Sequence, residues 1–545
     1  MKASYLAFPA LFSVASLHAS GCARERTEAP DLLLLGGKVF TAEETRPWAE
    51  AVAIRGERIL AVGTSVEIDS LGGPDTRRIH LGGRTVIPGI NDAHRHFQPK
   101  PPPEQTLALS GLEPSWDETR AAIEKKAAEA PEGAPIYGIV GVTVTTDPGI
   151  DRARLDAVAP RHPVMLSAFY GHGLIVNSPG LAALAVEEEK TDPVGGFFER
   201  QPGSRRVNGR IFEYAQWSLM RRASGSIPDG EILEQLRAES AEMLRLGIAS
   251  IQDMPMIPLG RYLDSVAKAQ LPLRVRAIRF PMTGVEGRNL SEDIDVSSRG
   301  SVTVAGVKWI LEGTPLERGV LLEAPYADRP DWSGRLNFEV EEIAAMLRES
   351  VERDEPLLLH VVGDRTLALL FDAMENMKDV DWPALRLRIE HGDGLVGGLV
   401  ERARRLGVIV VQNPTHFALA EFMHPRLGPQ RRFFPMKSLL AAGIPVAIGS
   451  DGSPNPWLDV MLAVVHPTRP EEALSVEQAV TAYTRGSAYA EFREGDKGTL
   501  AAGKLADLAV LSQDVFTVPA DAIAATESVL TMIGGRIVHD PGVLN

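Results

Sequence analysis

Short apolar segments alternate with helix-like segments along most of this 545-residue chain. The apolar segments are rich in valine, isoleucine and leucine and are bounded by glycine and proline, which is typical of strands buried in a parallel sheet. Clear examples lie at residues 85–90, 356–359, 385–390 and 444–450. The pattern therefore predicts an α/β fold in which helices connect parallel strands.

Three of these segments are followed by a residue that can bind a cation. His360 follows the second segment, His391 the third and Asp451 the fourth. The active site of an α/β barrel lies at the carboxyl ends of its strands, where these side chains would meet. Taken singly, each has an ordinary structural explanation, either a histidine satisfied in the core or an aspartate that caps a helix. Together they predict a metal site.

A histidine pair follows the first segment. His94 and His96 are two residues apart on an extended segment, so both rings point to the same face. Two such rings can bind one cation, although solvated surface histidines show the same spacing. The strand-end residues downstream favour the metal site.

Lys308 interrupts an otherwise apolar strand at residues 304–311. A buried ammonium group is costly unless it is paired, so this lysine either reaches solvent at a strand edge or pairs with Glu312. A third alternative is carbamylation by carbon dioxide. The carbamate would be an anionic ligand able to bridge two metal ions.

The order and spacing of these residues resemble the amidohydrolase superfamily. The surrounding sequence resembles its YtcJ-like, N-substituted formamide deformylase-like branch, amidohydrolase family 3. The strings that carry the resemblance are residues 88–94, 155–160, 171–178, 360–365, 388–391 and 449–452. The resemblance extends from about residue 31 to the C-terminus, and the ordered set is more specific than any member.

The resemblance implies a (β/α)8 barrel of the TIM type, as in metallo-hydrolases, with a small β-sandwich made from both chain ends. We place the barrel, with insertions, at residues 88–495 and the sandwich at residues 31–87 and 496–545. Strand-length apolar segments and glycine turns near both ends agree with this sandwich.

The region between His96 and Lys308 contains more candidate strands than the barrel needs. They lie near residues 136–140, 163–169, 247–252 and 272–279. At least one of them must therefore belong to an insertion. Residues 191–213 are rich in glycine, proline and arginine, which predicts a long loop of the kind that often forms a lid.

The resemblance also implies one or two divalent metal ions, most often zinc, and a set of ligands. The ligands are His94, His96, carbamylated Lys308, His360, His391 and Asp451. The first two histidines would bind one ion and the last two the other, and the carbamate would bridge them.

Such a centre implies hydrolysis of an amide-type carbon–nitrogen bond, for which this branch suggests an N-substituted formamide. A metal-bridging hydroxide would attack the carbonyl, and Asp451 would act as general acid and base for the departing amine. One alternative is an esterase, lactonase or phosphotriesterase on the same bimetal site. The other is an exported binding lipoprotein without catalytic activity.

Other polar residues are candidates for substrate contacts. His172 follows a predicted strand and could donate a hydrogen bond to a carbonyl oxygen, which also makes it a catalytic candidate. The remaining candidates are His416, Asp364, Arg365 and Glu312. The branch often has aspartate where this chain has Glu312, which puts in doubt the substrate contact that this aspartate makes. Loop histidines and a surface ion pair are the structural alternatives, and Glu213 matches the branch with an equally open role.

Composition restricts the partners. The net charge of −15, with no basic cluster, argues against nucleic acid or an anionic membrane surface as the principal partner. The hydrophobic content of 44% is enough for a sizeable core. We expect a small-molecule substrate, and a homo-oligomer remains open.

The N-terminus has the pattern of a targeting segment. Residues 1–22 combine a lysine, an apolar run and small residues before Cys22, the only cysteine, so an intramolecular disulfide is impossible. This arrangement resembles a bacterial lipoprotein signal, with residues 23–30 as a linker. Ala19 stands where leucine is usual, so simple export or an uncleaved anchor stays open. We expect an exported protein of a bacterium, periplasmic or attached to the membrane through lipid on Cys22.

Overall fold

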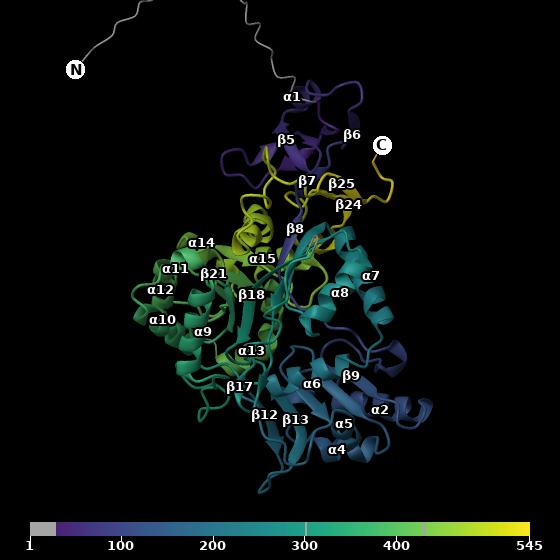
Figure 1. Ribbon diagram of the computed structural model, residues 1–545, viewed down its shortest axis with the longest axis vertical. Helices are drawn as coiled ribbons and strands as arrows, with labels where there is room; N and C mark the ends of the chain where they lie inside the picture. The colour runs from purple at the N-terminus through teal and green to yellow at the C-terminus, as the bar shows by residue number, and fades with distance from the viewer. Residues whose placement is uncertain (1–28, 300–301, 429–431, 545) are drawn as a thin grey trace, which may run out of the picture.

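The computed structural model describes residues 29–299, 302–428 and 432–544 (Figure 1). The predicted signal segment and Cys22 lie outside the described residues, so the predictions of export and lipid attachment remain predictions. None of the helices in the described part of the chain is long and apolar enough to cross a membrane.

Eight parallel strands form the central barrel, which confirms the predicted fold class. Their order in the sheet follows their order in the chain. They are β8 (Ile90–Arg95), β14 (Ile248–Asp253), β15 (Arg274–Arg279), β18 (Val302–Ile310), β19 (Leu357–Val361), β20 (Arg388–His391), β21 (Ile409–Gln412) and β22 (Val446–Ile448). The predicted apolar segments supply β19, β20 and β22, because strands covered on both faces need nearly continuous apolar sequence.

The first and last barrel strands meet at their carboxyl ends. The Asp451 amide donates a hydrogen bond of 2.9 Å to the His94 carbonyl oxygen. Ser450 donates from its amide and its hydroxyl to the two carboxylate oxygens of Asp92, at 2.9 and 2.6 Å. These bonds bring the residues after β22 against the histidine pair of β8.

Amphipathic helices cover the outside of the barrel. Each buries one row of apolar side chains and exposes charged residues on the other face. They include α7 (Asp229–Arg245), α8 (Leu259–Ala269), α9 (Val340–Arg353), α10 (Asp364–Asn376) and α12 (Gly398–Leu406). Together with the strands they enclose one large apolar core.

A second sheet is inserted between β8 and β14 and lies at the end of the molecule opposite the sandwich (Figure 1). Its strands are β9 (Ile136–Val140), β10 (Val164–Ala168), β11 (Leu174–Val176), β12 (Gly196–Arg200) and β13 (Val207–Glu213). Apolar clusters of its own support this sheet. Of the four candidate strands in this region, the first two therefore belong to the insertion and the last two to the barrel.

The prediction of a long loop over residues 191–213 was wrong. β12 and β13 pair as an antiparallel hairpin, with Gly203 (φ 68°) in the connecting turn. The polar composition of this segment does not prevent a strand. Arg210 is buried, and its guanidinium donates hydrogen bonds to the carbonyl oxygens of Thr145, Asp147 and Ile150. Arginine-rich sequence can form a strand when neighbouring backbone accepts its hydrogen bonds.

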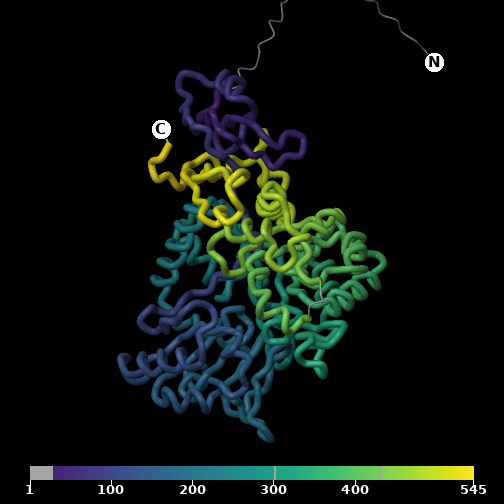
Figure 2. The backbone as a smooth tube through the Cα atoms, turned by 180° about the vertical axis from the view of Figure 1, so that it is seen from behind, coloured from purple at the N-terminus to yellow at the C-terminus, as the bar shows by residue number. Residues whose placement is uncertain are grey.

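Strands from both chain ends form the sandwich, where the C-terminal segment lies against the N-terminal one (Figure 2). One sheet contains β1 (Leu32–Leu35), β4 (Ala51–Arg55), β5 (Arg58–Gly63) and β6 (Arg77–His80). The other combines β2 (Lys38–Phe40), β3 (Trp48–Ala49) and β7 (Thr85–Pro88) with β23 (Leu508–Leu511), β24 (Ser528–Ile533) and β25 (Arg536–His539).

Gly89 joins the sandwich to the barrel. Its amide donates to the Asp507 carbonyl oxygen at 2.9 Å, and a Cβ at this position would lie 2.5 Å from the Ala249 Cβ. Only glycine fits such a close approach. β7 therefore passes directly into β8, and the sandwich holds the start of the strand that carries the histidine pair.

Candidate metal centre

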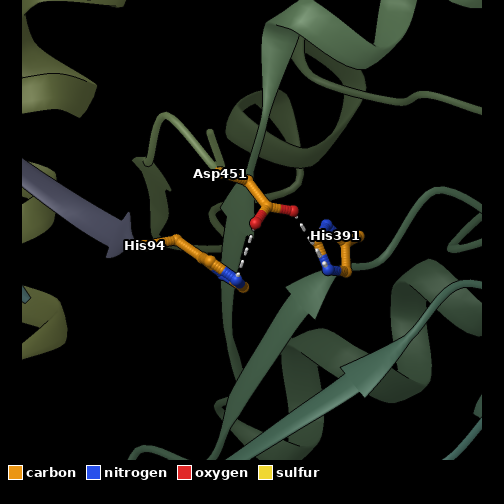
Figure 3. A group of neighbouring side chains, drawn as sticks. All are labelled: His94, His391 and Asp451. Atoms are coloured by element: carbon orange, nitrogen blue, oxygen red, sulfur yellow. Dashed lines mark ion pairs between the residues drawn. The ribbon is translucent and has the colours of Figure 1, made fainter. Parts of the chain in front are cut away.

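Three predicted ligands, two on barrel strands and one just after β22, face one another at the carboxyl end of the barrel (Figure 3). The Nε2 atom of His94 lies 3.5 Å from Oδ1 of Asp451, and Nε2 of His391 lies 4.0 Å from Oδ2. Both histidines are buried, whereas the Asp451 side chain is 21% exposed. The three side chains offer nitrogen and oxygen atoms at the spacing of a metal site.

The other predicted ligands lie beside these three. His96 places Nε2 3.2 Å from that of His94, and the ring centroids of His360 and His391 are 4.4 Å apart. Lys308 is buried on β18, where Asp451 and Glu390 are the anions that act on its charge. The structure thus brings all six predicted ligands into one group, which we call the ligand group.

The hydrogen bonds around the ligand group fit a bound cation. His94 directs Nδ1 to a carboxylate oxygen of Glu390 at 2.5 Å, and His96 donates from Nδ1 to the Met254 carbonyl oxygen at 2.9 Å. With Nδ1 protonated, a neutral imidazole carries a lone pair on Nε2. Two lone pairs would then face each other across 3.2 Å, which is favourable only with a proton or a cation between them.

The electrostatics of the group favour the metal-binding forms of the side chains. Burial holds the pKa of His360 and His391 well below the ordinary value, and burial with the nearby His94 lowers that of His96 to about 3. Neutral imidazoles are the form that binds metal. Burial opposes the charge of Asp451, but His94 and His96 hold its pKa well below the usual range.

Two of the ligands have unusual backbone conformations. His391 and Asp451 have φ angles of 71° and 43°, in the left-handed region that side chains other than glycine rarely adopt. Such strain is tolerated when surrounding contacts impose it, and it is frequent at functional sites. The Nδ1 atom of His391 is also buried without a hydrogen-bond partner among the described residues.

A model of the amidohydrolase family matches residues 77–539. The chain belongs to this family. The match covers most of the chain, including the whole barrel, the inserted sheet and the sandwich strands from β6 onward, and it confirms the resemblance inferred from the motifs. With its group of metal-ligating side chains, this amidohydrolase is a metal-dependent hydrolase.

Curated relatives match nearly the full length, and two of them indicate the same branch. The protein YtcJ of Bacillus subtilis (strain 168) is 27% identical over 532 residues, which cover 93% of this chain and 98% of YtcJ. The N-substituted formamide deformylase of Arthrobacter pascens is 25% identical over 520 residues, with 90% of this chain and 94% of the relative covered.

Solved structures share the fold. A metal-dependent hydrolase from Pyrococcus horikoshii OT3 matches with a TM-score of 0.69 at 21% identity, covering 90% of this chain and 99% of its own. The zinc complex of atrazine chlorohydrolase TrzN from Arthrobacter aurescens TC1 matches with a TM-score of 0.51 at 19% identity. The match covers 93% of this chain and 95% of the TrzN chain.

Two further histidines border the ligand group of this amidohydrolase. His416 places Nε2 3.6 Å from Oδ2 of Asp451, and its ring stacks on that of His391 at a centroid distance of 5.3 Å. His172 comes from the inserted sheet, and its ring centroid is 5.2 Å from that of His360. Both candidates for substrate contact therefore lie beside the predicted ligands.

The remaining candidates, Glu312, Asp364 and Arg365, form a separate set that we call the Glu312 group. One carboxylate oxygen of Glu312 accepts from the amides of Val362 and Gly363, each at 2.7 Å. The other accepts from the Leu321 amide at 2.7 Å and the Thr366 hydroxyl at 2.6 Å. Glu312 is thus bonded to the loops around it rather than to Lys308, and burial raises its pKa to about 7.

The other two members of the Glu312 group lie at the start of α10. Asp364 accepts from the Glu323 amide at 2.9 Å, and Nη1 of Arg365 lies 3.5 Å from Oε2 of the same glutamate. The Arg365 side chain is 45% exposed. These contacts are those of a surface ion pair beside a helix start.

The sequence patterns did not single out Glu390, which contacts a predicted ligand. Its buried carboxylate accepts from His94 and, at 2.9 Å, from Nε of Arg388. Burial opposes its charge, but Arg388 and His94 hold its pKa well below the ordinary value. Two opposite charges at spacing two within a buried strand were the available signal, since residues at that spacing share a face.

Proposed function

We propose that this amidohydrolase hydrolyses an amide-type carbon–nitrogen bond, with N-substituted formamides as the first substrate class to test. The position of Asp451 carries the proposal. Its carboxylate lies within 4.0 Å of ring nitrogens of His94, His96, His391 and His416, yet its side chain is 21% exposed. An anion so placed can accept a proton from an attacking water and return it to the amine that leaves.

The ligand group suits two divalent ions, and zinc is the ion we propose. Imidazole and carboxylate are ligands that zinc prefers, and the structural relative from Arthrobacter aurescens is a zinc complex. Bound ions would polarise the scissile carbonyl and lower the pKa of a coordinated water toward about 7. His94 and His96 would hold one ion, and His360 and His391 the other.

We also propose that Lys308 is carbamylated. Burial lowers the pKa of its amine to about 8, although Glu390 and Asp451 act in the opposite direction. At that pKa about a tenth of the amine is neutral at pH 7, and only the neutral amine reacts with carbon dioxide. The modification would replace a cation inside the ligand group with an anion that both metal ions can share.

His172 and His416 are the proposed contacts for the acyl group. They approach the ligand group from two directions, His172 from the inserted sheet and His416 from η2 (Pro414–Leu419) after β21. Side chains at these places can donate hydrogen bonds to a carbonyl oxygen as negative charge develops on it. Such donors would stabilise the oxyanion that forms when the carbonyl is attacked.

The test is hydrolysis by zinc-loaded protein of a matched panel: N-butylformamide, N-butylacetamide, butyl formate, a lactone and a phosphotriester. We expect release of formate and butylamine from the formamide, loss of that activity after chelation, and recovery with zinc. Hydrolysis confined to the ester, lactone or phosphotriester would replace this function with the corresponding one. Stoichiometric metal without turnover of any compound would indicate a binding protein.

A further inference from the structure

The inserted sheet contributes a side chain to the metal centre. His172 lies in the turn between β10 and β11, and its ring contacts two groups of the barrel side, His360 at 5.2 Å and Trp217 at 5.3 Å between centroids. The Trp217 contact is edge to face, and Trp217 donates from Nε1 to the Gly171 carbonyl oxygen at 3.1 Å. The turn that carries His172 is therefore fixed by its ring contacts with His360 and Trp217 and by the hydrogen bond from Trp217.

A carboxylate determines how the His172 ring is turned. Nδ1 of His172 donates to Oε1 of Glu213, the last residue of β13, at 2.9 Å. Both side chains are buried, so the hydrogen bond is not exchanged with water. This leaves Nε2 as the ring nitrogen without a hydrogen bond within the described residues.

Glu213 is itself held by the barrel. Its second oxygen accepts from Nδ2 of Asn337 at 2.8 Å, and the same amide group donates to the Ile310 carbonyl oxygen at 3.1 Å. Ile310 ends β18, the strand of Lys308. A continuous hydrogen-bonded path therefore runs from a barrel strand through Asn337 and Glu213 to His172.

The conformation and burial of Glu213 cost free energy that a purely structural residue would not need to cost. Glu213 has φ 56°, in a region that favours glycine, and its carboxylate is buried. Strain of this kind costs about 1–3 kcal/mol, and a buried charge costs more unless it is paired. An apolar side chain at a relaxed position would join the two sheets at lower cost.

We propose that Glu213 is a positioning residue that fixes the ring of His172, so that Nε2 is presented to the acyl group of a substrate at the metal centre. The inserted sheet is then part of the active site. The acyl contact rests on the proposed function, whereas the fixed ring orientation does not.

The same residues could instead bind a cation, and the experiments must distinguish this alternative. Ligand atoms of His172, Glu213 and Glu317 lie within 4.8 Å of one another, so a further cation could bind them. Each is already hydrogen-bonded, however, and Glu317 accepts from both the amide and the hydroxyl of Thr314. We therefore expect no metal here.

The first experiment observes the ring directly in the metal-loaded, full-length protein. Nitrogen-15 NMR of histidine-labelled protein, with the His172 signal assigned from His172→Gln, should show a protonated Nδ1 in a strong hydrogen bond. Glu213→Gln should shift or remove that signal. Glu199→Gln, on the neighbouring β12 and paired with Arg210, is the matched control and should leave it unchanged. An unprotonated Nδ1 in the wild-type protein overturns the proposal even if Glu213→Gln does not fold.

The second experiment measures hydrolysis of N-butylformamide and metal content in the same variants. Glu213→Gln should lower kcat roughly tenfold to a hundredfold, with KM changed less than about twofold, as expected for a residue that acts through another. Zinc content should equal that of the wild type. A metal equivalent lost with Glu213→Gln would overturn the proposal in favour of a cation site. If the wild-type protein cleaves no amide, the proposed function fails while the NMR result still decides the role of Glu213.

Discussion

The ligand group and the Glu312 group both lie near the carboxyl ends of barrel strands and are rich in ionisable side chains. They differ in how many of their polar atoms have a hydrogen-bond partner. Glu312 accepts four hydrogen bonds, three from the surrounding loops and one from the first turn of α10. In the ligand group, by contrast, ring nitrogens and carboxylate oxygens face one another at 3.2–4.0 Å, and one buried nitrogen of His391 has no hydrogen-bond partner among the described residues.

This difference separates a structural site from a functional one. A buried polar group whose hydrogen bonds are complete needs nothing from outside the protein, and its role is to join segments of the chain. A group of lone pairs that face one another is unfavourable until a cation is added. Residue type alone does not distinguish the two, because glutamate and aspartate occur in both.

The largest effect is expected from the ligand group. Asp451→Asn should lower kcat by about a thousandfold, because the amide cannot accept the proton that a general base removes. Steady-state hydrolysis of N-butylformamide measures the effect. Asp364→Asn in the Glu312 group is the matched control and should keep the wild-type rate. A rate for Asp451→Asn within tenfold of the wild type would assign proton transfer to another residue.

A smaller effect is expected from Glu390, the carboxylate that contacts the His94 ring. Glu390→Gln should weaken zinc binding by about tenfold to a hundredfold, because the carboxylate that orients the His94 ring becomes a neutral amide. Competition with a chromophoric chelator measures the dissociation constant. Glu401→Gln, on the exposed face of α12, serves as control. Unchanged affinity would mean that packing alone orients His94.

The Glu312 group should respond in stability rather than in chemistry. Glu312→Gln replaces an oxygen that accepts two hydrogen bonds with an NH2 group, so the free energy of unfolding should fall by about 2 kcal/mol. Urea denaturation measures this change, with metal content and kcat expected to stay at wild-type values. A lost metal ion or a large fall in kcat would join this group to the active site.

The smallest effect is expected at the surface ion pair. Arg365→Ala should change the free energy of unfolding by less than about 0.5 kcal/mol, since an exposed pair contributes little. Thermal unfolding and the kinetic constants for N-butylformamide should both match the wild type. A raised KM would instead identify Arg365 as a substrate contact and remove the contrast between the groups.

Much of the ligand group could be predicted from the sequence because its positions follow from local pattern. A polar residue that ends or directly follows a short apolar segment lies at the carboxyl end of its strand, and parallel strands bring those ends to one edge. His360, His391 and Asp451 are all of this kind. The pair His94 and His96 was visible for the same reason, since spacing two on a strand gives one face.

Other features depended on contacts between distant segments. β9 and β10 have the same apolar pattern as barrel strands, and only their pairing partners show that they belong to the inserted sheet. Likewise Glu312 and Glu390 are both buried glutamates near strand ends, yet Glu312 accepts four hydrogen bonds from nearby loops and α10, whereas Glu390 contacts the His94 ring. No local pattern separates these cases.

The sequence by itself therefore determined most of the barrel strands, the residues at their ends and the chemistry those residues can perform, because each depends on near neighbours in the chain. The tertiary structure decided which strands close the barrel, which polar groups are already satisfied and which remain open to a metal ion or substrate. Those decisions depend on the partner that each hydrogen-bonding atom meets, and the partner usually comes from a remote part of the chain.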